Sequence, residues 1–499
     1  MRIINRIKPK VLIFALAWIF LFPAALLSQE DQKQDSTAIS IIDSTLVSNR
    51  QDSTLVGNNQ DSTSVSNKQA RKEAKKQKQL SKKATKDSLS IVKTSADTSR
   101  VKQSAKSDTT VVKSVSAQDS GDYFQTDTLG HNELSPLDIQ SNRGIFILSQ
   151  DKLLQLRILG SVRVMFNGND RNLESKTAFN PYEIPTGSNV ASPNFYAGVS
   201  RTRLGLEITR RTKKAGDVFV RLEMDFSGGD NSNFRIRHAY GQFSHMIIGK
   251  TWSLFNNLSF APATVNNGGP VGSSSQWTTQ FRYFRKINKK MNWYAGIEYS
   301  SPDLDIPDSV IGTLVQVIPD FTARVNSTED QLSWQASAVI TTISGEDSIG
   351  DLSYAFGYGV ILGAKFILKK HDYFYISFIT GNSISHFINI FDSKGEDADY
   401  NSNTNNFEGN YVNSGYVAYE RKLPHDLSAS LSFGIAALTN HPFQLGNNFD
   451  YAYNVLLDAF WTPIPGARLG LEYAFGQRFD KDDSRGLANR VSILIYYDF

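Results

Sequence analysis

Six arginines are the residues whose type and spacing could do chemistry in this chain. They are Arg201, Arg203, Arg221, Arg235, Arg237 and Arg282. Two pairs among them stand two positions apart, which places both members of a pair on one face of a β-strand. A cluster of guanidinium groups beside a narrow passage attracts anions and repels cations. The sequence therefore predicts that these arginines act through fixed charge.

The same arginines have a second interpretation, as members of ion pairs between neighbouring strands. Glu207, Glu223 and Asp225 come within reach of Arg203 and Arg221 if the strands that carry them are adjacent. We favour a wall with net positive charge, because the long segment that follows the arginine-bearing strands contains no acidic residue that would offset it.

This uncharged segment, residues 253–277, is predicted to be a loop that folds inward. It follows Trp252 and contains Pro262, Gly268, Gly269 and Pro270. Glycine and proline allow the tight turns that a compact loop needs. Folded into a passage, such a loop would narrow it and leave the selection of ions to the arginines. The alternative is a loop that stands out on the surface.

The elements that must position these residues are β-strands. From Gly144 onward, segments of about ten residues alternate between apolar and polar with a period of two. In one segment Val218, Val220 and Leu222 share a face, and Arg221 lies on the other. A soluble β-sandwich alternates in the same way, so the pattern alone does not say which face meets which solvent.

The connections between strands favour a membrane barrel. Sixteen strands are predicted to begin near Leu153, Ser200, Asp217, Arg235, Met246, Trp277, Asn292, Phe321, Gln331, Tyr354, Asp372, Tyr411, Leu427, Phe449, Ala467 and Arg490. The predicted long connections are residues 168–199, 228–234, 253–276, 301–320, 344–353, 388–410, 440–448 and 478–489, and a short one lies between each two of them. An up-and-down transmembrane barrel has an even strand number, short periplasmic turns and longer outer loops. We therefore predict an all-β, antiparallel barrel over residues 143–499.

The chain end and the aromatic residues agree with this prediction. Phe499 resembles the terminal signal that the outer-membrane assembly machinery reads on such barrels. Aromatic residues near strand ends suit the girdles at the two membrane surfaces. The candidates are Tyr373, Phe374, Tyr375, Trp461, Tyr496 and Tyr497.

The first 142 residues have a different composition. Residues 1–28 combine a basic start with an apolar run and end on a small residue, as export signal peptides do. A retained transmembrane anchor is the alternative. Residues 29–142 are rich in Ser, Asp and Lys, and we expect a disordered periplasmic tail. This tail is either a solvated spacer or a basic tether with weak contact to an anionic periplasmic polymer.

Other classes of function have little support. The chain has no cysteine, so disulfides, thiol nucleophiles and Cys-ligated metals are excluded. None of its seven histidines has metal-ligand spacing. The net charge of +4 comes from the first 140 residues, so it does not indicate nucleic-acid binding by the strands. We expect no enzyme activity, no metal and no cofactor.

At the arginine-bearing strands the sequence resembles a known family, the DcaP-like trimeric porins. The motifs are Phe234-Arg-Ile-Arg-His-Ala-Tyr-Gly, Gly249-Lys-Thr-Trp-Ser-Leu-Phe, Ala261-Pro-Ala-Thr-Val-Asn, Gly269-Pro270 and Gln280-Phe-Arg-Tyr. The resemblance implies a sixteen-stranded trimeric barrel, whose third loop narrows a pore for small anions such as dicarboxylates. Its motif positions include Arg235, Arg237, His238, Trp252 and Arg282. In the family an acidic residue usually follows the loop proline, whereas Ala263 and Thr264 stand here. Its N-terminal part is often a coiled coil, in contrast to this tail.

The leading hypothesis is an outer-membrane porin of a Gram-negative bacterium, with its N-terminal tail in the periplasm. It would pass small, anionic solutes by diffusion. Its partners would be membrane lipid, lipopolysaccharide, the assembly machinery and two copies of itself. A barrel that does not conduct, acting as an adhesin or an envelope anchor, is the alternative from another class.

Overall fold

The computed structural model describes the greater part of the chain from Arg143 onward. The described residues are 143–187, 192–212, 216–229, 233–304, 313–314, 316–346, 352–401, 403–404 and 406–499. The predicted signal peptide and tail, residues 1–142, lie outside them. Within the described ranges, no helix is long and apolar enough to cross a membrane.

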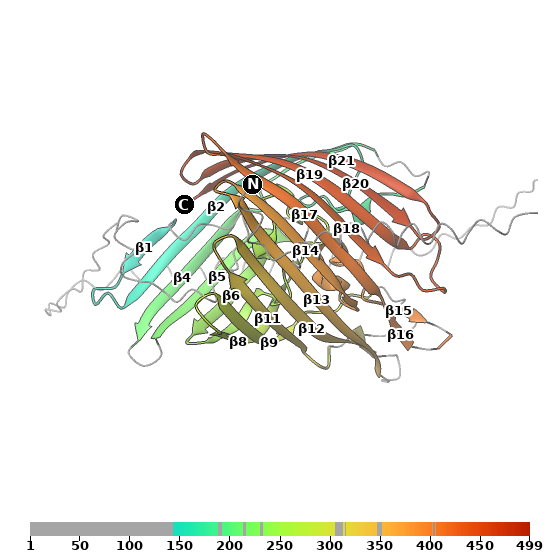
Figure 1. The fold of residues 1–499 in the computed structure, drawn as a ribbon, viewed down its shortest axis with the longest axis horizontal. Helices are drawn as coiled ribbons and strands as arrows, with labels where there is room; N and C mark the ends of the chain where they lie inside the picture. Colours follow the sequence, from blue (N-terminus) through green and yellow to red (C-terminus); the bar gives the residue numbers. More distant parts are fainter. Residues whose placement is uncertain are drawn as a thin grey trace, which may run out of the picture. The chain divides into compact units, whose positions relative to one another are not determined.

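Sixteen antiparallel strands run side by side around the barrel (Figure 1). They are β2 (Leu154–Asn169), β4 (Arg203–Thr212), β5 (Gly216–Gly228), β6 (Asn233–Phe243), β7 (Met246–Trp252), β8 (Trp277–Lys286), β9 (Met291–Tyr299), β11 (Asp320–Thr328), β12 (Leu332–Glu346), β13 (Leu352–Lys369), β14 (Asp372–Asn382), β17 (Tyr411–Leu423), β18 (Leu427–Leu438), β19 (Phe449–Ile464), β20 (Ala467–Asp480) and β21 (Arg485–Asp498). The barrel closes at Ser161 of β2, which pairs with Arg203 of β4 on one side and Asp498 of β21 on the other. The predicted fold and strand number are confirmed.

Smaller elements pair with strands of this wall or lie in the connections between them. β1 (Ile145–Leu148) and β3 (Asn194–Gly198) pair with the two halves of β2, and β10 (Thr313–Leu314) pairs with the end of β12. β15 (Ala398–Asn401) and β16 (Asn406–Gly409) form a separate hairpin. The described helices are single 3-10 turns: η3 (Pro181–Glu183), η4 (Leu258–Phe260), η5 (Ser385–Phe387) and η6 (Asn389–Phe391).

The strand alternation separates an apolar outer face from a polar inner face. In β4, Leu204 and Leu206 are 43% and 42% exposed, whereas Arg203 and Glu207, which flank them, are buried. A band of exposed aliphatic side chains around a closed barrel is the surface that lipid covers. The fold thus places the polar residues in the interior by simple period-two geometry.

Three of the predicted girdle aromatics face the interior. Tyr375 and Tyr496 are buried inside the barrel, and Tyr373 lies on the same face of β14 as Tyr375. The girdle prediction is wrong for these residues, because the alternation on β14 and β21 turns them inward. Trp461 and Tyr497 are 47% exposed on the outer face, as predicted.

One predicted long connection is short. Strand β20 continues to Asp480 and β21 begins at Arg485, which leaves a turn of residues 481–484 where a loop over 478–489 was predicted. The backbone hydrogen bond from Asp480 to Ser484 closes this turn. Polar residues such as Arg485 and Arg478 extend the ladder beyond the apolar part of the strands, and the sequence pattern missed that extension.

A β-bulge changes the inward face of β6. Glu223 of β5 pairs with His238, and the next residue, Met224, pairs with Ile236, so Arg237 has no partner of its own in this ladder. A bulge re-aims side chains by inserting one extra residue. As a result Arg237 and His238, although adjacent in sequence, are both buried in the interior.

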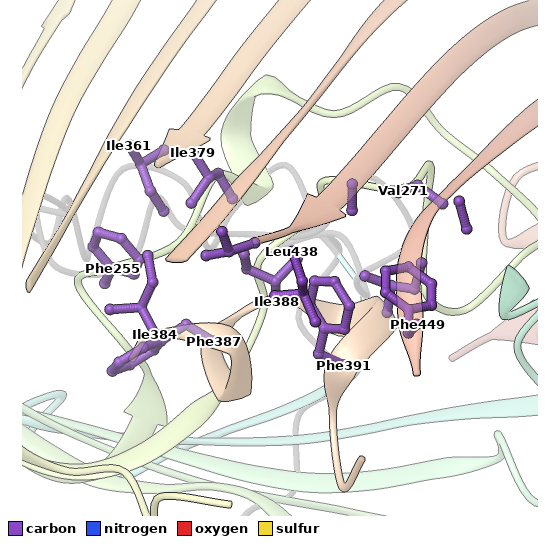
Figure 2. Packing of buried hydrophobic residues seen from close by; sticks show 14 of the residues in the cluster. Phe255, Val271, Ile361, Ile379, Ile384, Phe387, Ile388, Phe391, Leu438 and Phe449 are labelled. Atoms are coloured by element: carbon purple, nitrogen blue, oxygen red, sulfur yellow. The ribbon is translucent and has the colours of Figure 1, made fainter. Parts of the chain in front are cut away.

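Two long connections enter the barrel and pack against each other. We call residues 253–276 the third long connection and residues 383–410 the sixth. Figure 2 shows the apolar cluster between them, in which Phe255 of the third lies near Ile384 and Phe387 of the sixth. The rings of Phe255 and Phe387 meet edge to face with centroids 5.2 Å apart. This cluster gives the two connections a common packed core inside the barrel.

Candidate functional site

The third long connection crosses the interior from one wall to the opposite one. Its two ends leave β7 and β8 at Trp252 and Trp277, which are direct partners in the ladder. On the far side, the backbone N–H of Val265 donates to Asp458 of β19 at 2.8 Å, and the N–H of Asn266 donates to Glu472 of β20 at 2.7 Å. These carboxylates thus take two consecutive amides of the connection and fix its middle against the far wall.

Side chains of the near wall hold the root of the same connection. Arg282 of β8 donates from Nη2 to the carbonyl oxygen of Trp252, and Arg324 of β11 donates to that of Leu254. Glu298 of β9 accepts the N–H of Leu254 at 2.8 Å. Arg282, which the sequence suggested as a selectivity residue, is therefore fully buried as an anchor of the connection. Pro270 lies further along, where its carbonyl accepts from Ser273 at 2.8 Å.

Four of the predicted arginines form ion pairs along the wall. Arg237 lies 2.9 Å from Glu223 and 3.1 Å from Asp225. Arg235 also pairs with Asp225, at 2.8 Å. Arg203 lies 3.8 Å from Glu223. Arg221 lies 3.3 Å from Glu207 and contacts Glu223. The cross-strand pairing that the sequence left as an alternative is thus present in the structure.

After this pairing, the wall has more guanidinium groups than carboxylates and so a net positive charge. The five guanidinium groups of Arg157, Arg203, Arg221, Arg235 and Arg237 share the three carboxylates of Glu207, Glu223 and Asp225. Arg201 donates to the carbonyl oxygen of Val265 at 2.7 Å and thereby contacts the third long connection. Arg157, which the sequence reading did not include, belongs to the same set through its 2.6 Å contact with Glu207.

Two stacked indole rings hold Arg235 and Arg237 in place. The rings of Trp252 and Trp277 lie 4.2 Å apart and nearly parallel. The guanidinium groups of Arg235 and Arg237 lie 5.0 Å and 4.8 Å from the Trp277 ring centroid. Cation–π contact of this kind restricts a flexible side chain without neutralising its charge. The positive groups are therefore fixed in position while they remain charged.

A cavity of about 170 Å³ lies where the arginine wall meets the third long connection. Arg201, Arg203, Arg235 and Arg237 line one side of it, and Trp252, Pro262, Gly268 and Gly269 also line it. Arg221 and Arg282 are not among its lining residues. The structure thus brings together four of the six predicted arginines at one open space.

The sixth long connection completes this cavity with residues that the sequence reading missed. Asn389 and Asp392 also line the cavity, and the side chain of Asn389 donates to the carbonyl oxygen of Gly268 at 2.9 Å. Asp392 follows the apolar run Phe387-Ile388-Asn389-Ile390-Phe391. Such a run in a predicted loop was the available signal that this segment is buried inside the barrel.

Ionisable groups hold the sixth long connection. His386 contacts Asp397 at 2.8 Å, and the hydroxyl of Tyr182 donates to Glu396. Burial lowers the pKa of His386, but the charge and hydrogen bond of Asp397 outweigh it, so that this pKa is raised from its usual value. Burial raises the pKa of Glu396 to about 7, although the hydrogen bond from Tyr182 opposes the shift.

Within the described ranges, no group of three or more His, Cys, Asp or Glu side chains is placed to hold a metal ion. His238, the histidine of the arginine-bearing strand, lies 3.0 Å from the hydroxyl of Thr251 and packs its ring against Trp252. Its contacts are those of a packed wall residue.

The sequence pattern of the DcaP outer membrane protein family matches residues 138–499. The chain belongs to this family. The predicted resemblance is thereby confirmed, and it extends over the whole described barrel. The motifs quoted from residues 234–283 are those that form the arginine wall and the root of the third long connection.

One solved structure shows the same fold. The outer membrane channel DcaP of Acinetobacter baumannii is 20% identical, with a TM-score of 0.61, and the match covers 71% of this chain and 99% of that one. An anion-selective porin from Comamonas acidovorans is 12% identical, with a TM-score of 0.48, over 69% of this chain and 100% of that one. No curated protein sequence matches this chain.

Proposed function

We propose that this chain is an outer-membrane porin, through which small anionic solutes diffuse passively. The observation that carries the proposal is the cavity beside the arginine wall, where fixed positive groups and the third long connection line one open space. Membership in a family of outer membrane proteins supports the location. Dicarboxylates are the solute class that the family resemblance suggests.

The arrangement suits anions for an electrostatic reason. Arg201, Arg203, Arg235 and Arg237 line the cavity, and Asp392 is the acidic residue on its lining. A ring of like charge beside a narrow passage sets ion selectivity because the passing ion loses part of its water shell there. Arg221 and Arg282 serve this site indirectly: Arg221 holds Glu223, and Arg282 holds the root of the third long connection.

Orientation and assembly are part of the proposal. An even strand number brings both ends of the barrel sequence to the end with short turns, which is the periplasmic end of such barrels. The tail before Arg143 would then emerge into the periplasm. We also propose a homotrimer, with contacts through outward faces of the barrel, as the family resemblance implies. Phe499 serves as the assembly signal in this view.

Ion selectivity in planar lipid bilayers tests the function. Reversal potential in a KCl gradient should show anion preference for the full chain. Arg235→Gln with Arg237→Gln should reduce that preference by about two- to ten-fold, because two fixed charges leave the cavity wall. Arg210→Gln with Arg211→Gln is the matched control, since these exposed residues carry the same charge outside the interior. A cation-selective wild-type channel, or equal effects of the two double variants, contradicts the proposal.

A barrel that does not conduct is the second candidate, and one observation favours it. The apolar cluster of the third and sixth long connections fills part of the interior, with Phe255, Phe387 and Phe391 fully buried (Figure 2). If the purified, folded chain inserts into the bilayer and gives no current steps, the porin function is contradicted. An adhesin or an envelope anchor is then favoured.

A further inference from the structure

A second cluster of charged and aromatic side chains faces the interior on the wall away from the arginines. It consists of Lys365 on β13, Tyr373 and Tyr375 on β14, and Glu420 and Lys422 on β17. Lys365 is the ladder partner of Tyr375, and Tyr373 is the partner of Glu420. The cluster therefore occupies three adjacent strands close to their short turns.

The strand alternation aims these side chains inward. On β14 they share a face with Ser377, whose hydroxyl accepts a hydrogen bond at 2.8 Å from Asn257 of the third long connection. On β13, Lys365 shares a face with the fully buried Ile361. Tyr419, which separates Glu420 from Ala418 on β17, is exposed on the outer face. These lysines consequently differ from interfacial lysines, which point outward to lipid head groups.

Two ammonium groups share one ring in this cluster. Nζ of Lys365 lies 4.9 Å from the ring centroid of Tyr373 and 5.3 Å from that of Tyr375. Nζ of Lys422 lies 5.2 Å from the same Tyr373 centroid. Two like charges gathered around one phenol repel each other, and the ring compensates only part of that cost.

The nearby carboxylate does not neutralise the pair. Glu420 accepts a hydrogen bond from the hydroxyl of Tyr375 at 3.1 Å. In the described part of the chain, no ion pair within 4.0 Å joins Lys365 or Lys422 to a carboxylate. The cluster holds two cations and one anion, and its phenol hydroxyl on Tyr373 is a further hydrogen-bond donor. This combination fits a bound carboxylate group.

We propose that Lys365 and Lys422 form a second anion-binding position, near the end of the barrel with the short turns, for carboxylate-bearing solutes. The proposal rests on the porin function proposed above. The arginine-lined cavity and this position lie on different walls, so a solute would exchange one cationic surface for another along its path. The lysine pair raises the local concentration of anions at this end and speeds their entry from it.

The rate at which citrate blocks the channel current, measured separately from each side of the membrane, tests the proposed anion-binding position. Because the chain has no cysteine, Lys289→Cys in an exposed short turn lets a membrane-impermeant thiol reagent report the orientation of each inserted channel. In this background, Lys365→Gln with Lys422→Gln should slow citrate association from the short-turn side by about ten-fold. Association from the other side should change by less than about two-fold, because the arginine wall there is intact.

The matched control removes the same charge from the same end. Lys369→Gln with Lys370→Gln alters exposed lysines at the turn after β13, and should leave citrate association close to wild type. Lys365→Arg with Lys422→Arg keeps the charge and should retain the wild-type rate. If the double Gln variant folds poorly, Lys422→Gln alone gives the test, since this side chain is exposed to the interior solvent.

The outcomes separate the two proposals. A wild-type chain with no current overturns the porin function, and this position with it. If the wild type conducts and prefers anions, but the Lys365/Lys422 and Lys369/Lys370 double Gln variants behave alike, only the lysine position is overturned. The total positive charge at this end of the barrel then explains the entry rate. Loss of side-specific association in the Lys365 and Lys422 variant alone supports it.

Discussion

The third and sixth long connections lie against each other inside the barrel, yet they are built from opposite kinds of residue. The third, residues 253–276, contains no charged residue and no histidine. The sixth, residues 383–410, contains one histidine, one lysine and five acidic residues, which are His386, Lys394, Asp392, Glu396, Asp397, Asp399 and Glu408. The two segments share one apolar core and differ in how they are held.

This difference predicts a fixed position for the third connection and an adjustable position for the sixth. Backbone amides of the third connection bind side chains of the wall, such as Asp458, Glu472 and Asn454. The sixth is held in part through its own ionisable groups, such as His386 with Asp397 and Glu396 with Tyr182. A segment without ionisable groups keeps its charge state at every pH, whereas the sixth connection does not. We therefore expect the third connection to define the passage and the sixth to modulate it.

The largest test removes the far-wall anchors of the third connection. Asp458→Ala with Glu472→Ala leaves the amides of Val265 and Asn266 without acceptors, at a cost of about 1–3 kcal/mol each. The connection should detach from the far wall, and single-channel records should show about two-fold larger conductance with frequent sublevels. Asp482→Ala with Asp483→Ala removes equal charge from the exposed turn after β20 and serves as control. Unchanged, quiet conductance in the first variant means that these anchors do not fix the passage.

A second test makes the sixth connection resemble the third by removing a titrating group. Burial raises the pKa of Glu396 to about 7, from an ordinary value of about 4.3. Asp397, Asp399 and Arg478 also act on this carboxyl group. A raised folded-state pKa means that docking is most stable below the ordinary value and loses that stability as pH rises through about 7.

The raised pKa of His386 acts in the same direction, since its contribution is also lost as pH rises. Open-channel noise should therefore increase as pH rises from about 5 through about 7. Glu396→Gln should remove the step near neutral pH, and Glu329→Gln, an exposed residue at a short turn, should leave it in place. A wild-type channel with the same noise throughout this range contradicts an adjustable sixth connection.

The sequence predicted the barrel because its information is local and repeated. Period-two alternation and the spacing of turns recur sixteen times, so errors at single strand ends, as at Arg485, do not change the result. The inward side of Tyr373 and Tyr375 was harder to predict. Aromatic residues near a strand end suit both a membrane girdle and an interior wall, and a run of three places members on both faces.

The candidate site depended more on contacts between distant segments. Arg235 and Arg237 could be assigned to the interior by alternation, although the bulge that also turns His238 inward has no clear sequence signal. The role of Arg282 as an anchor required the position of the Trp252 carbonyl at the end of β7, which only the folded structure supplies. Asp392 is far from the arginines in sequence, and its place in the cavity depends on the apolar packing of the sixth connection.

The smallest test concerns the near-wall anchor of the third connection. In Arg282→Lys an ammonium group keeps the charge but cannot reproduce the fork that reaches both the Trp252 carbonyl and the side-chain oxygen of Gln280. We expect unfolding to become easier by about 1 kcal/mol, with reversal potential unchanged because the cavity wall is untouched. Arg285→Lys on the same strand, where the side chain is exposed, should change neither property. A shift in reversal potential with Arg282→Lys would mean that this residue sets selectivity directly, and the distinction between anchors and cavity-lining arginines would then fail.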